Sequence, residues 1–144
     1  IDLIASPRNR EEQEQNTIIN YALDSLWDIK KTTSGLYYDV VQEGDGEKIE
    51  WADRLEVHYE GFFPNGTPFD SSYDREKPMK FYVGNMIDAW NEGLQLVAPK
   101  GELRLLVPSR LAYGVEGLVN SKGDTLVPAH QVLIFKIKVL RKIQ

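Results

Sequence analysis

Apolar residues at helical spacing mark the first part of the chain as an amphipathic helix. They recur three or four positions apart, as along one helix face, at Ile18, Ala22, Leu26 and Ile29. Ser6-Pro7 has the form of an N-cap followed by proline in the first helical position. The charges agree with a helix dipole, because acidic Glu11, Glu12 and Glu14 come early and Lys30-Lys31 comes late. The sequence therefore predicts a helix that ends before Gly35.

From residue 34 onward the apolar period changes to two, which is typical of strands with one buried face. The alternating segments that predict strands are 36–42, 54–60, 79–83, 103–107 and 133–139. A short helix interrupts them, because Ile87, Trp90 and Leu94 lie at helical spacing and Asp88 is able to cap its start. One helix among antiparallel strands predicts an α+β fold in which the sheet wraps the helix.

The pattern divides the chain into a helical extension at 1–33 and a second domain at 34–144. The apolar stripe of the extension must pack on the following domain, on a second copy or on a partner. Two segments of the domain, 61–78 and 114–130, show no alternation and predict long loops. Loops of that length in a compact domain tend to be functional.

Composition narrows the class of protein. The 144 residues carry a formal net charge of −5 without a basic stripe, which argues against nucleic-acid binding. The absence of cysteine excludes thiolate catalysis and disulfides. Two histidines without further ligands in view predict no metal site. No apolar run is long enough to span a bilayer, and a chain beginning with Ile1 is expected to be a processed product.

An ordered series of short motifs runs through the second part. It comprises Val57-His58-Tyr59-Glu60-Gly61, Phe69-Asp70-Ser71-Ser72, Trp90-Asn91-Glu92-Gly93-Leu94, Leu111-Ala112-Tyr113-Gly114 and Val127-Pro128-Ala129-His130. Over residues 34–142 this series resembles the FK506-binding-protein (FKBP) family of peptidyl-prolyl cis–trans isomerases. The resemblance implies a half-wrapped antiparallel β-sheet around one short α-helix, with an apolar pocket between them. The extension at 1–33 lies outside the resemblance.

The resemblance also implies roles for individual residues in that pocket. Trp90 would be the floor under the substrate proline. The aromatic walls would be Tyr59, Phe69 and Phe135. Asp70 would lie beside the twisting amide, either acting on it electrostatically or ordering its neighbours. The backbone N–H of Ile87 and the hydroxyl of Tyr113 would hold substrate carbonyls.

Further residues would complete the surroundings of this site. The rim would be formed by Met86, Leu126 and Val127, and Arg75 would order the loop around Asp70. Met79 stands where the family often has an aromatic residue, which keeps the volume but softens the wall. Taken singly, each aromatic residue would be read as ordinary core; only the ordered series favours a pocket.

The expected function is therefore cofactor-free isomerisation of Xaa-Pro bonds in proline-containing polypeptides, assisting protein folding. A chaperone or binding module with weak or no turnover is the alternative. Macrolide inhibitors of the FK506 type are possible ligands, and the 1–33 helix is a candidate for dimerisation or partner contact. A helix ahead of such a domain resembles secreted bacterial members, including lipoproteins. It predicts a periplasmic or outer-membrane-anchored location, with the cytoplasm as the alternative.

Overall fold

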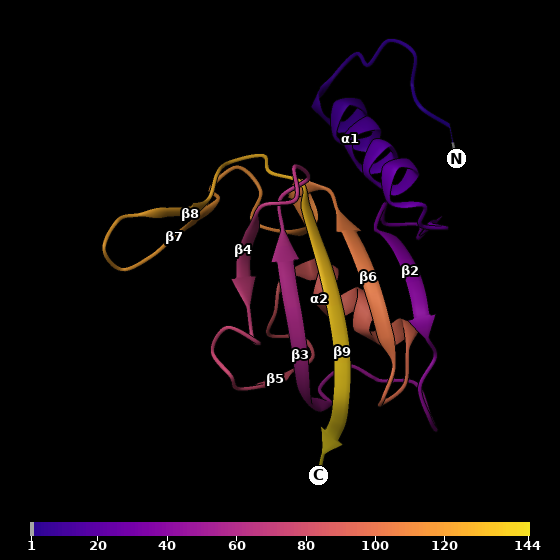
Figure 1. Cartoon of the computed structure of the whole chain (residues 1–144), viewed down its shortest axis with the longest axis vertical. Coiled ribbons are helices and arrows are strands. Elements are labelled where there is room, and N and C mark those ends of the chain that lie inside the picture. Colours follow the sequence, from indigo (N-terminus) through magenta and orange to yellow (C-terminus); the bar gives the residue numbers. More distant parts are fainter. Residues whose placement is uncertain (1) are drawn as a thin grey trace.

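The computed structural model describes residues 2–144 and is built on one large antiparallel sheet (Figure 1). Its helices are α1 (Arg10–Ser25) and α2 (Asp88–Gly93), with 3₁₀ turns η1 (Leu94–Leu96) and η2 (Ser109–Leu111). Its strands are β1 (Lys30–Lys31), β2 (Tyr37–Gln42), β3 (Arg54–Phe62), β4 (Pro68–Ser71), β5 (Met79–Tyr82), β6 (Glu102–Val107), β7 (Leu118–Val119), β8 (Thr125–Val127) and β9 (Leu133–Ile143). The seven-stranded sheet has the order β1-β2-β6-β9-β3-β4, with β5 also paired to β3, while β7 and β8 form a separate hairpin.

The inner face of the sheet wraps α2, as the alternation of apolar residues predicts. Along β3, Leu55, Val57 and Tyr59 are buried while the residues between them are more exposed. The same holds for alternate positions of β6 and β9, and these side chains form one core with Ala89 and Trp90 of α2. The predicted α+β fold, a half-wrapped antiparallel sheet around a short helix, is confirmed.

The helix α1 covers part of the opposite face of the sheet (Figure 1). Its apolar stripe places Ile18 and Ala22 against Tyr37 of β2, Leu106 of β6 and Ile134 of β9, all of which are buried. At this end the central strands are therefore covered on both faces. This explains why β6 ends, and β9 begins, with consecutive buried residues rather than an alternation.

The boundaries of α1 differ from the prediction. The N-cap is Asn9, whose side-chain oxygen accepts the Glu12 N–H at 2.9 Å, so Ser6 does not cap the helix. The helix ends at Ser25 because Leu26 adopts a left-handed conformation with φ 59°. Lys30–Lys31 pairs with β2 as strand β1 instead of completing the helix. The extension thus contributes a strand to the main sheet.

Short strands lie within the two segments predicted as loops. In 61–78, β4 pairs with β3 and places Asp70 opposite Gly61. In 114–130, β7 and β8 form a hairpin that projects from the body of the domain (Figure 1). Strands of two to four residues are too short to leave a period in the sequence. At α2 the N-cap is Ile87, and Asp88 is the first helical residue rather than the cap.

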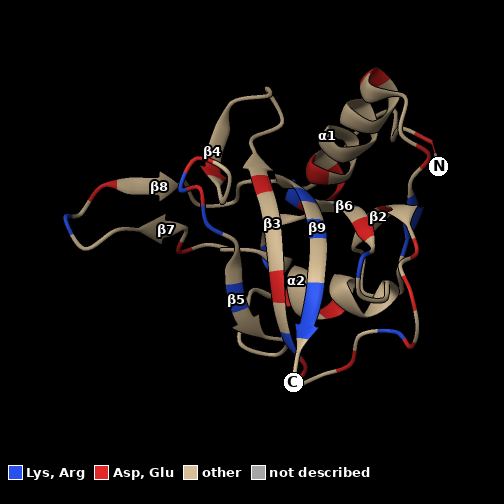
Figure 2. Cartoon of the chain, turned by 60° about the horizontal axis from the view of Figure 1, so that its bottom comes forward, with Lys and Arg blue, Asp and Glu red and all other residues tan. Residues whose placement is uncertain are grey.

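Charged residues are interspersed along the central strands β3 and β9 (Figure 2), at positions that are less buried than their apolar neighbours. Glu56 of β3 lies 3.4 Å from Arg141 of β9 and 3.9 Å from Lys80 of β5, and Asp53 lies 3.2 Å from Lys142. The Lys and Arg partners of these pairs are about half-exposed, and pairs open to solvent on one side contribute little to stability, so the fold depends mainly on its apolar layers. Within residues 2–144 no helix is both long enough and apolar enough to cross a membrane.

The contact between α1 and the sheet generates a test of whether the extension is part of the folded unit. Ile18 is fully buried, whereas Leu23 of the same helix is 57% exposed. Ile18→Ala should lower the free energy of unfolding by about 2–5 kcal/mol, because it leaves a cavity between helix and sheet. The matched change Leu23→Ala should alter it by no more than about 0.5 kcal/mol. Urea denaturation measures both, and an unchanged main transition in Ile18→Ala would show that α1 is an independent appendage.

Candidate active site

The indole ring of Trp90 is the centre of an aromatic cluster on the inner face of the sheet. Trp90 lies on α2 and is only 2% exposed. Tyr59 of β3 meets it edge to face with ring centroids 5.0 Å apart, and Phe81 of β5 and Phe135 of β9 each lie 5.5 Å away. These edge-to-face arrangements are favourable because the ring edges are positive and the ring faces negative. The indole is therefore held by rings from three separate strands.

A glycine makes room for the outer wall of the cluster. Phe69 of β4 packs on Phe135 with centroids 5.8 Å apart, and both rings lie over the position of Gly61 on β3. A Cβ atom at residue 61 would lie 2.6 Å from the ring of Phe69 and 3.1 Å from that of Phe135. The close approach of two rings to the strand thus requires glycine at this position.

The aromatic residues border an open cleft of about 360 Å³ between α2, the sheet and the loop that follows η2. The lining side chains are Tyr59, Phe69, Asp70, Met79, Asn85, Met86, Ile87, Trp90, Tyr113 and Phe135. Aromatic and aliphatic groups predominate, and Asp70 is the only charged residue among them. A concave, mainly apolar site with a few polar groups is the usual form of a small-ligand site.

The carboxylate of Asp70 is held on one side of the cleft by two neighbours. The Tyr59 hydroxyl donates to Asp70 Oδ2 at 2.5 Å, and Arg75 Nη1 donates to Oδ1 at 2.7 Å. Arg75 Nη2 also donates to the Tyr59 hydroxyl oxygen at 2.8 Å, which closes a triangle. Burial raises the pKa of Tyr59 to about 12, and the hydrogen bond to Asp70 adds to this effect. Tyr59 therefore stays neutral and remains a donor at ordinary pH.

Of the hydrogen-bond donors at the cleft, the two that the resemblance assigns to substrate carbonyls remain available for a ligand. Within residues 2–144, the Ile87 N–H and the Tyr113 hydroxyl have no hydrogen-bond acceptor. Burial raises the pKa of Tyr113, and the negative charge of Asp70 raises it further, so this hydroxyl also keeps its proton. The site thus combines an aromatic floor with these two donors at its edge.

The side chain of Asn91 fixes the loop that carries the Ile87 N–H. It is buried on α2, and its oxygen accepts the N–H groups of Gly84 at 2.7 Å and Met86 at 3.1 Å. Its amide nitrogen donates to the carbonyl of Met86 at 2.8 Å. Three backbone groups of this loop thus bind one buried side chain of α2. Helix α2 therefore fixes the orientation of the peptide between Met86 and Ile87, which carries the Ile87 N–H.

The structure brings together most of the site residues that the resemblance implies, with the exceptions of Leu126 and Val127. Arg75 does not line the cleft but orients Asp70, as expected for a residue that orders this loop. Leu126 and Val127 also do not line it: Leu126 is 44% exposed on β8, and Val127 is buried in the core. The projecting β7–β8 hairpin carries Leu126 away from the cleft lining, whereas Val127 packs into the core.

Two residues of the site were not predicted. Asn85 lines the cleft from the short loop before α2, and Phe81 packs beneath Trp90. Phe81 could have been inferred from the alternation of β5, which directs it to the same face as Met79. For Asn85 the sequence offers no comparable signal, because it follows a glycine in an irregular turn.

The histidines lie away from the cleft lining. His58 Nδ1 lies 2.8 Å from the Ser72 hydroxyl, and its ring stacks on Tyr73 with centroids 4.4 Å apart, so it supports the sheet. The His130 N–H donates to the Gly114 carbonyl at 2.9 Å and braces the preceding loop. Across residues 2–144 no three His, Cys, Asp or Glu side chains are grouped to hold a metal ion.

The elevated pKa of Tyr59 generates a prediction about alkaline stability. The unfolded chain loses this proton near the ordinary pKa of 10.0, whereas the folded chain keeps it up to about 12. The contribution of Tyr59 to stability is therefore complete below pH 10.0 and is lost as the pH rises through about 12. In urea denaturation across this range, Tyr59→Phe should lose stability less steeply than the unsubstituted chain. Tyr82→Phe, at a half-exposed tyrosine of β5, is the control, and equal slopes for all three proteins would contradict the assignment.

Comparison with known proteins agrees with this geometry. The family model described as FKBP-type peptidyl-prolyl cis-trans isomerase matches residues 45–140. A probable FKBP-type peptidyl-prolyl cis-trans isomerase of Haemophilus influenzae is 40% identical over 113 residues, which are 78% of this chain and 45% of that protein. The chain thus spans less than half the length of this curated relative.

Solved structures extend the similarity to the three-dimensional arrangement. A peptidyl-prolyl cis-trans isomerase from Pseudomonas syringae has a TM-score of 0.77 at 27% identity, covering 99% of this chain and 100% of that one. The crystal structure of AtFKBP13 has a TM-score of 0.72 at 33% identity, covering 81% of this chain and 99% of the other. With the aromatic cleft and its two free donors, these similarities lead to one conclusion. The chain belongs to the family of FKBP-type peptidyl-prolyl cis–trans isomerases.

Proposed function

We propose that this chain is a peptidyl-prolyl cis–trans isomerase that acts on Xaa-Pro bonds of proline-containing polypeptides in the cleft over Trp90. One observation carries the proposal: side chains from α2 and four strands converge on a single open, mainly apolar cleft with two unpaired donors beside it. Family membership supports it.

The reaction requires rotation about a bond and no covalent chemistry. The partial double-bond character of the imide C–N bond sets a barrier of about 18–20 kcal/mol. Cis and trans Xaa-Pro forms differ by only about 0.5–1 kcal/mol, so the equilibrium needs no energy source. A catalyst must only favour the half-rotated imide over both planar forms.

The aromatic cleft is suited to that preference. A planar imide has a strongly polar carbonyl that loses water on entering an apolar site, whereas the twisted imide has lost resonance and carries a less polar carbonyl. The prolyl ring would lie on the face of Trp90 between Tyr59 and Phe135, because these rings form the floor and walls of the cleft. Desolvation then raises the free energy of the planar state more than that of the twisted state.

The two free donors would confine the twist to a single bond. A substrate carbonyl on one side of the proline would accept from the Ile87 N–H, and another would accept from the Tyr113 hydroxyl. Holding both flanks in place makes rotation an intramolecular event with little motion of the rest of the chain. If these contacts together lower the barrier to rotation by about 5–7 kcal/mol, the rate of isomerisation rises by about four to five powers of ten.

We assign Asp70 mainly to positioning. Both of its carboxylate oxygens already accept hydrogen bonds, one from Tyr59 and one from Arg75. Its charge also favours the protonated state of Tyr113, and so keeps that donor in place. Asp70 thus acts on the substrate largely through the two tyrosines on either side of the cleft.

A binding or chaperone module with little turnover is the second candidate. It is favoured by the flexible Met79 in the wall and by apolar side chains exposed on and beside the β7–β8 hairpin, namely Val115, Val119 and Leu126. These side chains would contact unfolded clients outside the cleft. Macrolides of the FK506 type would occupy the cleft itself, because they present an apolar ring to the same floor.

We also propose a periplasmic or outer-membrane-anchored location, with the cytoplasm as the alternative. The arrangement of a helix ahead of the domain, which resembles that of secreted bacterial members, supports it. A gene that encodes a signal peptide ending in a lipid-modified cysteine would support the location, and an initiator Met directly before Ile1 would contradict it.

We also propose that the extension contacts a second copy of the chain. The exposure of Leu23 and Leu26 supports this contact, and sedimentation of the chain tests it.

The proposed activity predicts a specific effect of one hydroxyl. The chain should accelerate cis–trans exchange of short Xaa-Pro peptides in a protease-coupled assay. Tyr113→Phe should lower kcat/KM by about 2- to 10-fold, because one hydrogen bond to the substrate is lost. The apolar ring stays in place, so the fold should be unaffected.

Tyr82→Phe is the matched control, since it removes the hydroxyl of a half-exposed tyrosine of β5 that does not line the cleft. Its kcat/KM should equal that of the unsubstituted chain. Folded protein that gives no acceleration over background would refute the enzymatic proposal. Retained binding of unfolded chains in that case would favour the module.

A further inference from the structure

The turn that carries Tyr113 is attached at its base to the N-terminal helix. Glu14 of α1 is only 9% exposed and reaches Ser109, the first residue of η2. The Ser109 N–H donates to one carboxylate oxygen of Glu14 at 2.6 Å, and the Ser109 hydroxyl donates to the other at 2.7 Å. Both carboxylate oxygens of Glu14 therefore accept hydrogen bonds from one residue, which lies 95 positions further along the chain.

Ser109 in turn fixes both neighbours of Tyr113. Its carbonyl oxygen accepts the N–H of Ala112 at 3.0 Å and the N–H of Gly114 at 2.8 Å. The carbonyl of Tyr113 accepts the N–H of Gly117 at 2.9 Å, which closes the turn on its far side. The backbone on either side of Tyr113 is therefore hydrogen-bonded to the same residue, Ser109, that Glu14 holds.

The chemistry of the Glu14 contact makes it a strong constraint. A buried carboxylate is costly unless its oxygens are paired, and hydrogen bonds to a charged acceptor are shorter and stronger than neutral ones. Movement of Ser109 away from α1 would leave the carboxylate buried without partners. The position of η2 relative to α1 is thus sharply defined.

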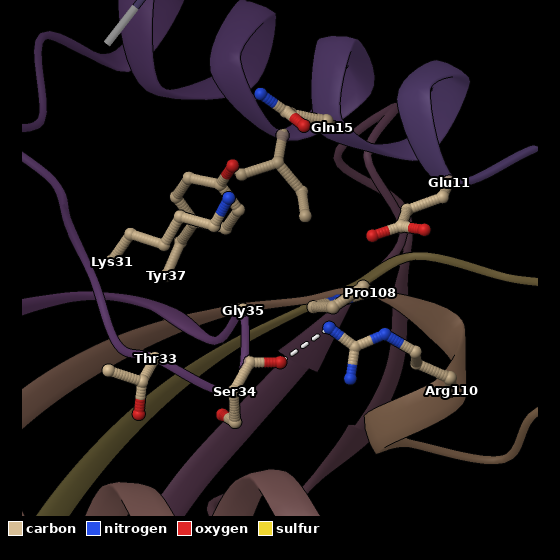
Figure 3. Close-up of a pocket in the computed structure, with 10 residues that line it drawn as sticks. Glu11, Gln15, Lys31, Thr33, Ser34, Gly35, Tyr37, Pro108 and Arg110 are labelled. Atoms are coloured by element: carbon tan, nitrogen blue, oxygen red, sulfur yellow. Dashed lines mark hydrogen bonds between the residues drawn. The ribbon is translucent and has the colours of Figure 1, made fainter. Parts of the chain in front are cut away.

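A second contact ties the same turn to α2. The Arg110 guanidinium donates to the carbonyl of Ser34 (Figure 3), and the Ser34 hydroxyl donates to Glu92 of α2 at 2.6 Å. Around this contact the seam between α1 and the domain is not close-packed. A cavity of about 130 Å³ lies there, bordered by Glu11 and Gln15 of α1 and by Tyr37 and Arg110 of the domain (Figure 3). Apolar contacts of Ile18 and Ala22 hold α1 on the sheet, and within residues 2–144 the hydrogen bonds of Glu14 join α1 directly to η2.

We propose that Glu14 is a positioning residue for the isomerase reaction, by which the N-terminal helix sets the reach of the Tyr113 hydroxyl into the cleft through Ser109. The inference rests on the proposed function. A small displacement of the Tyr113 hydroxyl would slow the reaction, because catalysis depends on the exact position of a donor. Loss of the contact between Glu14 and Ser109 would therefore lower the rate of isomerisation, although Glu14 does not touch the substrate. The extension at 1–33 would then form part of the working enzyme.

The test compares two glutamates of the same helix in the full chain. Glu14→Ala should lower kcat/KM on Xaa-Pro peptides by about 2- to 10-fold, which is the range for losing the Tyr113 hydrogen bond. Glu11→Ala is the matched control, because the Glu11 side chain borders the cavities of the seam without making a hydrogen bond within residues 2–144. Its kcat/KM should be unchanged.

A double-mutant cycle separates positioning from general stability. If Glu14 acts through Tyr113, Glu14→Ala should have no further effect on kcat/KM in a Tyr113→Phe background. Glu14→Gln should retain most of the activity, since its amide can accept from the Ser109 N–H and donate to the hydroxyl. Ser109→Ala, which keeps the backbone contact, should give a smaller loss of about 2-fold and serves where Glu14→Ala proves unstable.

Nuclear magnetic resonance of the chain with isotope-labelled tyrosines reports the environment of the Tyr113 ring independently of turnover. The Tyr113 ring signals, assigned from Tyr113→Phe, should shift in Glu14→Ala and stay in place in Glu11→Ala. Unchanged Tyr113 signals, or equal loss of kcat/KM in both Tyr113 backgrounds, would overturn the inference. An unsubstituted chain without isomerase activity would instead refute the proposed function, while the tyrosine signals would still decide whether Glu14 positions Tyr113.

Discussion

The packing of three aromatic rings against the indole of Trp90 is the interaction on which the site depends. Trp90 is brought to the inner face of the sheet by a helix of only six residues, too short to be stable alone. Its position is therefore set by Tyr59, Phe81 and Phe135, which arrive from β3, β5 and β9. The same contacts that bury the core thus also hold the floor of the cleft, and fold and site cannot be varied independently.

Polar contacts then place a few groups around this apolar floor. Asp70 is held by Tyr59 and Arg75, the loop before α2 by Asn91, and the turn of Tyr113 by Ser109. Preorganisation of this kind is what a catalyst without covalent chemistry requires, because it must supply oriented groups at the moment of rotation. In this account α1 belongs to the same arrangement, since its apolar stripe covers the outer face of the sheet and Glu14 holds Ser109.

The sequence predicts the fold and the cleft wherever a residue repeats at a regular period or belongs to a motif. The strands β2, β3, β5, β6 and β9, the helix carrying Trp90, and the convergence of Tyr59, Phe69 and Phe135 are of this kind. It fails where a feature depends on tertiary context. The end of α1 at Leu26 comes from a left-handed turn that directs Lys30–Lys31 into the sheet, and β4 and the β7–β8 hairpin are too short to show a period. Glu14 reads as one more charge at a helix start, because its partner lies 95 residues away.

The central claim is that a dry cleft over Trp90 holds the prolyl ring while two donors fix the flanking carbonyls. A crystal structure of the chain with a short Xaa-Pro peptide tests it most directly. We predict the prolyl ring on the face of Trp90, one peptide carbonyl on the Ile87 N–H and another on the Tyr113 hydroxyl. A peptide bound along the β7–β8 hairpin or on the outer face of the sheet, with the cleft left open, would contradict the account.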